Sequence, residues 1–278
     1  MKTIAIVTGA SSGMGREFAL QLARTRNLDE IWLVARRGDR LDALASDIRQ
    51  IGLALRSSDA DSGRAYPSPR AIPLDLAGSA GISRFRALLD AEPAATAGEL
   101  IIDTLVNNAG FGTYGPFADT PLSRELEMVE LNVTALTGLC HLAVPFLGRG
   151  SRIINVASLA SFIPLGNFAC YAATKAYVLS LSVALAAELA DRGIAVTACC
   201  PGPVDTEFAN VASNGAREAV VDGKDPARVV AHALRAASRG KTVAIMALKW
   251  KFKAFMSRLV GRYFFARYAY VHEKRPSR

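Results

Sequence analysis

The chain has 278 residues and is 51% hydrophobic, which is enough for one large domain with a buried sheet. Its formal net charge of +8 is unevenly distributed, because residues 1–240 carry 23 basic and 24 acidic side chains whereas residues 241–278 carry 10 and 1. The excess positive charge therefore belongs to the C-terminal tail, and the body has no charge bias that would favour nucleic acid.

The sequence has few residues that could form a metal site or a disulfide. Cys140, Cys170, Cys199 and Cys200 lack the spacing of a metal site or a disulfide framework, and the three histidines are scattered. We expect no metal ion and buried free thiols. No signal-peptide core precedes the first strand, and no apolar run is long enough to span a bilayer. A cytoplasmic location is therefore expected.

Strands and helices are predicted to alternate along the chain. Apolar, β-branched runs predict strands at residues 3–8, 30–35, 71–74, 105–106, 151–158, 194–200 and 242–246. Helical periodicity predicts helices from residue 16 and over residues 38–51, 122–147, 171–190 and 225–239. Residues 57–69 are rich in Ser, Asp, Gly and Pro and predict an exposed loop. The alternation resumes after this loop, so it does not separate two domains.

A glycine-rich turn follows the first predicted strand and opens the first helix. Its residues are Gly9, Ser11, Ser12, Gly13, Met14 and Gly15. Glycines let a backbone approach a pyrophosphate closely, and the free N–H groups of a helix N-terminus attract it. The second strand ends in Arg36 and Arg37, with no acid that would suit a free ribose hydroxyl. The sequence therefore favours NADP(H) over NAD(H).

Two further junctions lie where parallel strands would end. Asp75 and Leu76 follow the third strand and are placed to contact adenine, while Asn108, Ala109 and Gly110 follow the fourth. Ligands of open α/β sheets bind at this carboxyl edge.

Tyr171 and Lys175 lie four residues apart on a predicted helix, so they share one face. A tyrosine hydroxyl has a pKa near ~10, and a cation about 4 Å away could lower it towards neutrality. The spacing is common by chance, but Ser158 follows a strand upstream and Asn132 lies within an earlier helix. An asparagine inside a helix is disfavoured unless its side chain has a structural or catalytic task.

These motifs together resemble the short-chain dehydrogenase/reductase family, specifically its NADP-preferring single-domain members. The resemblance covers residue 3 to about residue 246, and its only change in the glycine turn is Met14, where the family usually has Ile or Leu. It implies an α/β fold with a doubly wound, seven-stranded parallel sheet and helices on both faces. It further implies hydride transfer between a nicotinamide and a carbonyl or secondary alcohol.

The resemblance also assigns roles to residues of this chain. Tyr171 would be the general acid, Ser158 would polarise the carbonyl oxygen, and Asn132 would hold a water for proton relay. Lys175 would bind the nicotinamide ribose and lower the pKa of Tyr171. The residues implied to bind the cofactor are those of the three junctions, Tyr171, Lys175, and Pro201, Gly202, Val204 and Thr206 after the sixth strand.

The loops around the expected carbonyl site are rich in aromatic residues. They offer Phe111, Tyr114, Phe162, Leu165, Phe168 and Phe208, with no Lys or Arg among them. We therefore expect a hydrophobic ketone or alcohol, as for a ketone reductase or a hydroxysteroid-dehydrogenase-like enzyme, and no clamp for an anionic head group.

The tail is not explained by these motifs, so we divide the chain into a catalytic domain, residues 1–247, and a tail, residues 248–278. Leu248, Phe252, Phe255, Leu259 and Tyr263 recur at helical spacing among basic residues. We favour a helix whose apolar stripe is buried over the cleft or against a second subunit. The alternative is a helix that lies on an anionic membrane surface through residues 248–270.

The helix over residues 171–190 is apolar or small on nearly every side, which predicts a homodimer or homotetramer. Two other functions remain open. One is a non-catalytic NADP(H) sensor or scaffold of the same fold. The other is a serine hydrolase that uses Ser11, because residues 9–13 fit the G-x-S-x-G pattern.

Overall fold

Seven parallel strands form one continuous sheet. The computed structural model describes residues 1–58, 66–218, 220, 222–257, 259–273 and 275. The strands are β1 (Lys2–Thr8), β2 (Glu30–Ala35), β3 (Ser68–Pro73), β4 (Leu100–Asn107), β5 (Arg152–Val156), β6 (Ala195–Cys199) and β7 (Val243–Ala244). Their order in the sheet is β3-β2-β1-β4-β5-β6-β7. The predicted doubly wound, seven-stranded α/β fold is confirmed.

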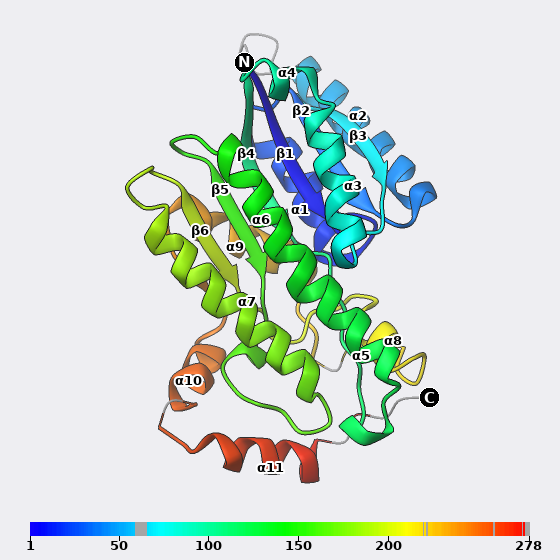
Figure 1. Cartoon of the computed structure of the whole chain (residues 1–278), viewed down its shortest axis with the longest axis vertical. Helices are drawn as coiled ribbons and strands as arrows, with labels where there is room; N and C mark the ends of the chain where they lie inside the picture. The colour runs from blue at the N-terminus through cyan, green and yellow to red at the C-terminus, as the bar shows by residue number, and fades with distance from the viewer. Residues whose placement is uncertain (59–65, 219, 221, 258, 274, 276–278) are drawn as a thin grey trace.

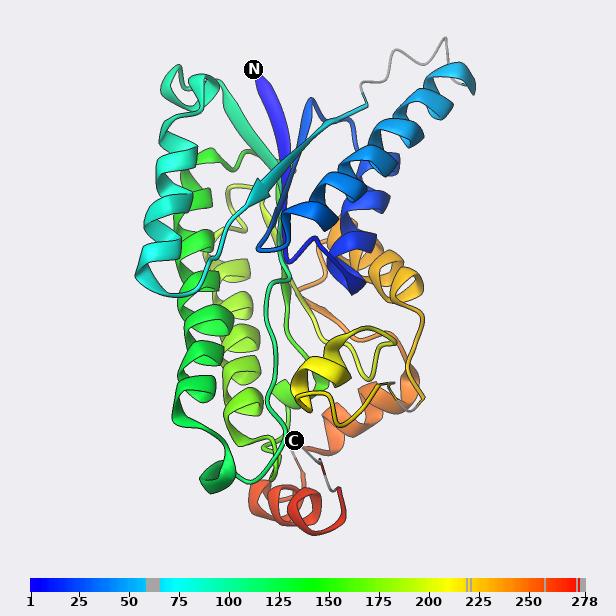
Figure 2. The same ribbon diagram turned by 90° about the vertical axis from the view of Figure 1, so that its right-hand side faces the viewer.

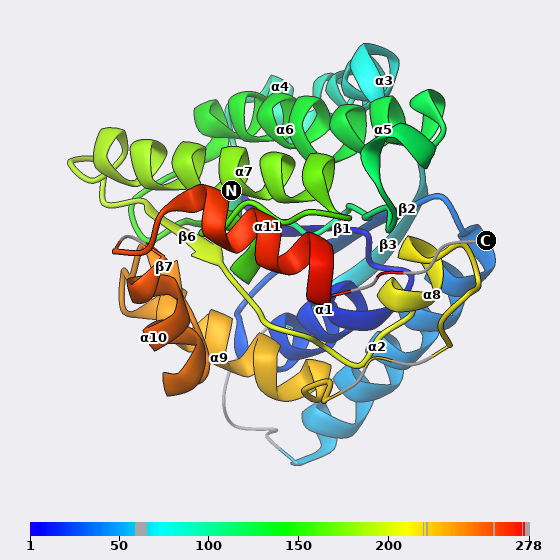
Figure 3. The same cartoon turned by 90° about the horizontal axis from the view of Figure 1, so that it is seen from below.

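Helices cover both faces of this sheet (Figures 1 and 3). One face carries α1 (Gly13–Thr25), α2 (Gly38–Ser58) and α9 (Pro226–Ser238), and the other carries α3 (Gly78–Asp90), α6 (Leu136–Ala143) and α7 (Ala169–Glu188). Shorter elements are α4 (Pro93–Thr96), α5 (Leu122–Val129), α8 (Phe208–Ala212) and the 3₁₀ turns η1 (Phe117–Asp119), η3 (Val144–Phe146) and η4 (Leu159–Ser161).

The strands are apolar on both sides because both sides are covered. Along β1, Ile4 and Ile6 pack into one hydrophobic core, and Ala5 and Val7 pack into the other. Successive side chains of a strand point to opposite faces, and a parallel sheet covered by helices therefore needs apolar residues at every position.

The functional end of the sheet follows from the strand order. β1 pairs with β2 on one side and with β4 on the other, so the chain leaves neighbouring strands in opposite directions. The loops that follow β1 and β4 diverge there, which opens a crevice at the carboxyl edge. In Figure 1 this edge faces the lower half of the molecule.

Two boundaries differ from the sequence prediction. β3 begins at Ser68, inside the predicted loop, and residues 59–65 of that loop lie outside the described residues. Pro69 and Pro73 argued against a strand here, because proline has no N–H to donate to a neighbouring strand. β3 is the edge strand of the sheet, where a missing N–H is tolerated. The predicted helix over residues 122–147 is instead α5, a π-helical segment η2 (Glu130–Ala135), α6 and η3.

The tail also differs from the single helix that its spacing suggested. It forms α10 (Leu248–Met256) and α11 (Arg262–His272), and Gly261 caps the start of α11 with extended backbone. Both helices lie at the end of the molecule to which the strands point, with α11 lowest in Figure 2. The C-terminal part of α2 is at the opposite end.

The Phe85→Ala substitution tests the packing of α3 against the sheet. Phe85 is 1% exposed and its ring meets that of Trp32 edge-on, with centroids 6.5 Å apart. Truncation leaves a cavity, so we expect the free energy of unfolding to fall by about 3–5 kcal/mol in urea denaturation. Phe117→Ala, at a position that is 64% exposed, is the control and should change it by less than about 0.5 kcal/mol.

Candidate active site

A cavity of about 640 Å³ opens at the carboxyl edge of the sheet. Its walls come from the turn after β1, the ends of β2, β4, β5 and β6, the start of α7 and the tail. The size and the mixture of apolar walls with a few polar groups are typical of a ligand site.

The glycine turn is shaped for close backbone approach. Gly9 has φ +64°, a left-handed conformation that disfavours other residues, and a Cβ on Gly15 would lie 2.1 Å from the carbonyl oxygen of Gly9. Asn108 locks the turn, because its Nδ2 donates to the carbonyls of Thr8 and Gly9 at 3.1 and 3.2 Å. The N-terminal N–H groups of α1 therefore face a space that side chains leave open, which fits a pyrophosphate.

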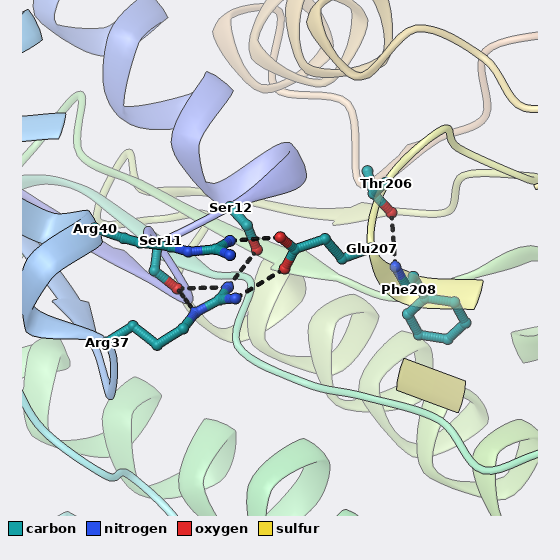
Figure 4. Close-up of polar contacts among 7 residues, drawn as sticks. All are labelled: Ser11, Ser12, Arg37, Arg40, Thr206, Glu207 and Phe208. Carbon is teal, nitrogen blue, oxygen red and sulfur yellow. Dashed lines mark hydrogen bonds and ion pairs between the residues drawn. The ribbon is translucent and has the colours of Figure 1, made fainter. Parts of the chain in front are cut away.

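Arg37 lies across this turn (Figure 4). Its Nη2 donates to the hydroxyls of Ser11 and Ser12 at 3.0 and 2.8 Å. Its Nη1 is 2.9 Å from a carboxylate oxygen of Glu207, and Arg40 pairs with the other oxygen of the same carboxylate. Hydrogen bonds from both arginines hold the pKa of Glu207 below its ordinary value. Two guanidinium groups thus meet at the adenosine end of the site, where Arg40 was not predicted.

Tyr171 and Lys175 occupy the first turns of α7 and are both buried, at 7% and 5% exposure. The ammonium of Lys175 donates to the carbonyl of Val156 at 2.7 Å and lies 5.7 Å from the centroid of the Tyr171 ring. Burial lowers the pKa of Lys175 from 10.5 to about 8. Burial also raises the pKa of Tyr171, against a hydrogen bond with Ser158 that acts to lower it.

This result corrects the electrostatic argument made from spacing. Desolvation of the buried hydroxyl disfavours the phenolate of Tyr171 more strongly than its neighbours favour it. In this state Tyr171 holds its proton at neutral pH.

Ser158 lies just beyond β5 and caps the short turn η4. Its hydroxyl accepts a hydrogen bond from the N–H of Ala160 at 3.1 Å, and its own N–H donates to Ser161 at 3.3 Å. Ser161 in turn donates to the backbone carbonyl of Lys175 at 2.7 Å. The cap therefore fixes Ser158 relative to α7, which carries both Tyr171 and Lys175.

Asn132 lies within the π-helical segment η2. Its amide donates to the carbonyl of Phe111 at 2.9 Å and to the hydroxyl of Thr174 at 3.1 Å, and its oxygen accepts from the N–H of Phe111. These bonds tie the loop after β4 to α7. Asn132 does not line the cavity; a Cβ on Gly110 would lie 2.6 Å from its Oδ1 and 3.6 Å from the Nζ of Lys175. π-Helical turns occur often at functional sites.

Aromatic side chains pack against the ring of Tyr171. The ring of Phe168 stacks on that of Tyr171 with centroids 4.1 Å apart, and Tyr114 and Phe208 meet Phe168 edge-on. These residues and Met128, Ala160 and Ala172 belong to a separate hydrophobic cluster. The wall beside this ring is therefore apolar.

Cations also reach this wall, contrary to the sequence expectation. Arg217 lies 5.5 Å from the centroid of Tyr114, and Arg275 lies 5.2 Å from that of Phe168. Arg275 is paired with Glu273 at 2.6 Å and donates to the carbonyl of Gly166. Arg217 comes from a segment that the sequence analysis did not place near the site, and Arg275 comes from the tail that was expected to lie over the cleft or against a second subunit.

Most of the predicted residues meet in this one cavity. Of the cofactor set, its walls include Gly9, Ser11, Ser12, Gly13, Met14, Arg36, Arg37, Asn108, Gly110, Tyr171, Lys175, Pro201, Gly202, Val204 and Thr206. Of the substrate set they include Phe111, Tyr114, Leu165, Phe168 and Phe208, and of the catalytic set Ser158, Tyr171 and Lys175.

Other predicted residues lie outside the cavity walls. Gly15 and Ala109 lie behind the turn, and Leu76 is buried in the main core. Asp75 accepts a hydrogen bond from the N–H of Ala77. Phe162 packs partly against the main core instead of the cavity, because η4 directs it away.

Trp250 and Lys253 of α10 line the cavity, although only a general lid was anticipated. A Cβ on Gly202 would lie 2.8 Å from the indole nitrogen of Trp250, so this ring rests on the backbone after β6. Among the described residues, no group of three His, Cys, Asp or Glu side chains could hold a metal ion.

Comparisons with known proteins agree with this geometry. The family model for short chain dehydrogenase matches residues 86–218. Serine 3-dehydrogenase of Agrobacterium fabrum is 32% identical over 222 residues, which cover 77% of this chain and 77% of that protein. The chain belongs to the short-chain dehydrogenase family. Members of this family are oxidoreductases that act on alcohol and carbonyl groups with a nicotinamide cofactor.

Solved structures of short-chain dehydrogenases give the same fold. One from Sphingobium yanoikuyae in complex with NADPH has a TM-score of 0.73 and 30% identity, and covers 93% of this chain and 94% of that one. The bulky-bulky ketone specific alcohol dehydrogenase of Comamonas testosteroni has a TM-score of 0.68 and 27% identity, with 93% and 92% covered. Other curated relatives, 30% identical, are longer, and the chain spans 35% of their length.

Membership of this dehydrogenase family argues against the serine hydrolase, whereas a non-catalytic sensor of the same fold stays an alternative prediction. Ser11 is the third residue after β1 and its hydroxyl accepts hydrogen bonds from Arg37, whereas the three histidines lie on α6, α9 and α11. Leu122–Phe146 and Ala169–Glu188 are apolar and long enough for a membrane span, as core helices can be, and both pack against the sheet.

The Lys175→Met substitution tests the buried ammonium through the pH dependence of stability. The pKa of Lys175 is about 8 in the folded chain and 10.5 when exposed, so the unfolded state binds more protons between these values. Stability of the wild type should therefore rise with pH in this window relative to the variant, by about 2–3 kcal/mol between pH 7 and pH 10. Urea denaturation of both proteins across this range measures it, and parallel curves would contradict the assignment.

Proposed function

We propose that the chain is an NADP(H)-dependent oxidoreductase for the carbonyl or secondary alcohol of a hydrophobic substrate. The observation that carries this proposal is the protonated, buried hydroxyl of Tyr171 beside Ser158, at the inner end of an aromatic wall. The catalytic unit would be residues 1–247, to which the tail adds Trp250 and Arg275 as parts of the cavity wall.

The side chains divide the proton chemistry between them. Tyr171 keeps its proton because it is buried, so it can donate that proton to a carbonyl oxygen in reduction. Ser158 would donate a hydrogen bond to the same oxygen and polarise it. The charge of Lys175 favours the tyrosinate that forms, and Asn132 holds the loop after β4 against α7. The nicotinamide would supply the hydride.

The adenosine end supports NADP(H). The guanidinium groups of Arg37 and Arg40 converge there, and Arg36 lines the same part of the cavity. A planar guanidinium suits a phosphate through two parallel hydrogen bonds. The similar structure from Sphingobium yanoikuyae holds NADPH, which agrees with this assignment.

The substrate end supports an apolar carbonyl compound. Phe111, Phe168 and Phe208 line the cavity near Tyr171. Arg275 stacks on Phe168 and is paired with Glu273, so its charge is balanced where it meets this wall. Similarity to a ketone specific alcohol dehydrogenase supports the same class of substrate.

The outer face of α7 supports association of two chains. Tyr177 and Val183 are exposed on it, at 39% and 44%. About a third of the residues in an 18-residue stretch of this helix are buried within one chain. We therefore propose a homo-oligomer in which this face is covered by a second copy.

The Tyr171→Phe substitution tests the reaction. We expect kcat for NADPH-dependent reduction of apolar ketones to fall about 10²–10⁴-fold, because the proton donor is lost, with little change in the Kd of NADPH. Absorbance of NADPH measures turnover, with keto acids as the polar comparison. Tyr114→Phe, which removes a second hydroxyl at the cavity wall, should keep most of the activity. Full activity of Tyr171→Phe, or turnover of keto acids alone, would contradict the proposal.

The ion pair with Glu207 offers a test of cofactor choice. Arg37→Ala should weaken NADPH binding about 10–100-fold, through loss of charged hydrogen bonds, and should leave NADH binding nearly unchanged. Glu207→Gln frees both arginines and should strengthen NADPH binding about 2–5-fold. Asp47→Asn, which breaks the equally exposed pair with Arg16, is the matched control. Fluorescence titration measures all three, and equal losses of NADPH and NADH affinity in Arg37→Ala would refute the assignment.

A further inference from the structure

Exposed apolar side chains are concentrated in the tail. The chain has seventeen large hydrophobic residues with exposed side chains among those described, and nine of them follow residue 247. We call these nine the tail surface: Leu248, Phe252, Phe255, Leu259, Tyr263, Phe264, Tyr268, Tyr270 and Val271. The tail is about a ninth of the chain, so this share is far above an even distribution.

The tail surface is ordered along helix faces. Leu248, Phe252 and Phe255 follow the spacing i, i+4, i+7 within α10, which places them on one side, and Leu259 lies in the turn after this helix. In α11, Phe264 and Tyr268 lie one turn apart, with ring centroids separated by 6.4 Å. Within one chain the apolar stripe is therefore not buried over the cleft, and its burial against a second subunit stays a prediction. The stripe points outward.

The opposite sides of the same helices attach them to the body. Ala254 and Ala269 are buried, and the indole of Trp250 rests on Gly202. The side chain of Asn167 donates to the carbonyls of Tyr270 and Glu273 at 3.0 and 3.4 Å, which anchors the last turn of α11. The orientation of the two helices is thus set by packing of small residues and by a cap.

Positive charge accompanies the apolar stripe. Lys249, Lys251, Arg262 and Arg267 are exposed on the two helices, and residues 241–278 hold one acid against ten bases. If two copies joined through this surface, the positively charged tail of one copy would face the positively charged tail of the other. The body, with 23 bases and 24 acids, has a net charge of only −1 to set against them.

We propose that the tail surface docks on the surface of an anionic phospholipid bilayer. Basic side chains then contact the lipid phosphates, and the aromatic and aliphatic side chains enter the headgroup region. α10 and α11 lie at the end to which the strands point, the end that bears the cavity (Figures 1 and 3). Docking therefore turns the cavity towards the bilayer, and the proposal holds whatever the substrate is.

Co-sedimentation with vesicles tests this proposal on the full chain. Vesicles of phosphatidylcholine with phosphatidylserine should pellet the protein. Vesicles of phosphatidylcholine alone should pellet at least about tenfold less, because the basic side chains of the tail then have no net negative surface to bind. Added salt should weaken binding to the anionic vesicles.

Two variants separate the apolar and charged contributions. Phe252→Ser with Phe255→Ser removes rings from the stripe, and Lys249→Glu with Lys251→Glu reverses two charges; none of these residues lines the cavity. Each variant should lose binding at least about tenfold. Leu53→Ser and Arg56→Glu, on the far part of α2, are the matched controls and should bind as the wild type does. Circular dichroism and NADPH binding verify that each variant is folded.

Three results would overturn the proposal. The first is wild-type protein that stays in the supernatant with anionic vesicles. The second is equal binding by the stripe variant and the wild type. The third is a smaller mass of the stripe variant than of the wild type in size-exclusion chromatography without lipid, which would assign the tail surface to a second copy.

Discussion

The site depends on a charged amine that is held away from water. Lys175 is 5% exposed and its ammonium donates to the carbonyl of Val156 at the end of β5. Burying a cation is unfavourable, and the fall of its pKa to about 8 measures that cost. The sheet, the cap at Ser158 and the helix α7 together keep it in place, because Ser161 bonds to the backbone carbonyl of Lys175 itself.

Desolvation also decides the state of Tyr171. The same burial that lowers the pKa of Lys175 raises that of Tyr171, so the amine is biased towards neutrality and the phenol towards keeping its proton. Tyr171 therefore keeps its proton, whereas Lys175, with a pKa of about 8, still carries its charge at neutral pH. A proton donor that is reluctant to ionise transfers its proton only when a developing oxyanion accepts it.

Patterns that are local in sequence predicted the fold and the inner site well. The strands are recognised from runs of neighbouring apolar residues. The glycine turn, Ser158 and Tyr171 are likewise recognised from the residues beside them in the chain. The π-helical segment at Asn132 and the edge strand with Pro69 could not be predicted, because both depend on neighbours in space. The same holds for Arg40 and Glu207, which are 167 residues apart and meet only in the folded chain. Arg217 and Arg275 reach the aromatic wall for the same reason.

The contact between Trp250 and Gly202 gives the molecule an internal optical probe. Trp250 and Trp32 are the two tryptophans of the chain. Trp32 is fully buried in the core against Phe85, so its emission should change little with conditions at the surface. Trp250 borders the cavity, and its ring rests on the backbone of Gly202 in the segment that continues to Thr206. Because its indole lines the cavity, both a bound ligand and a movement of the tail would change the surroundings of Trp250 and hence its fluorescence.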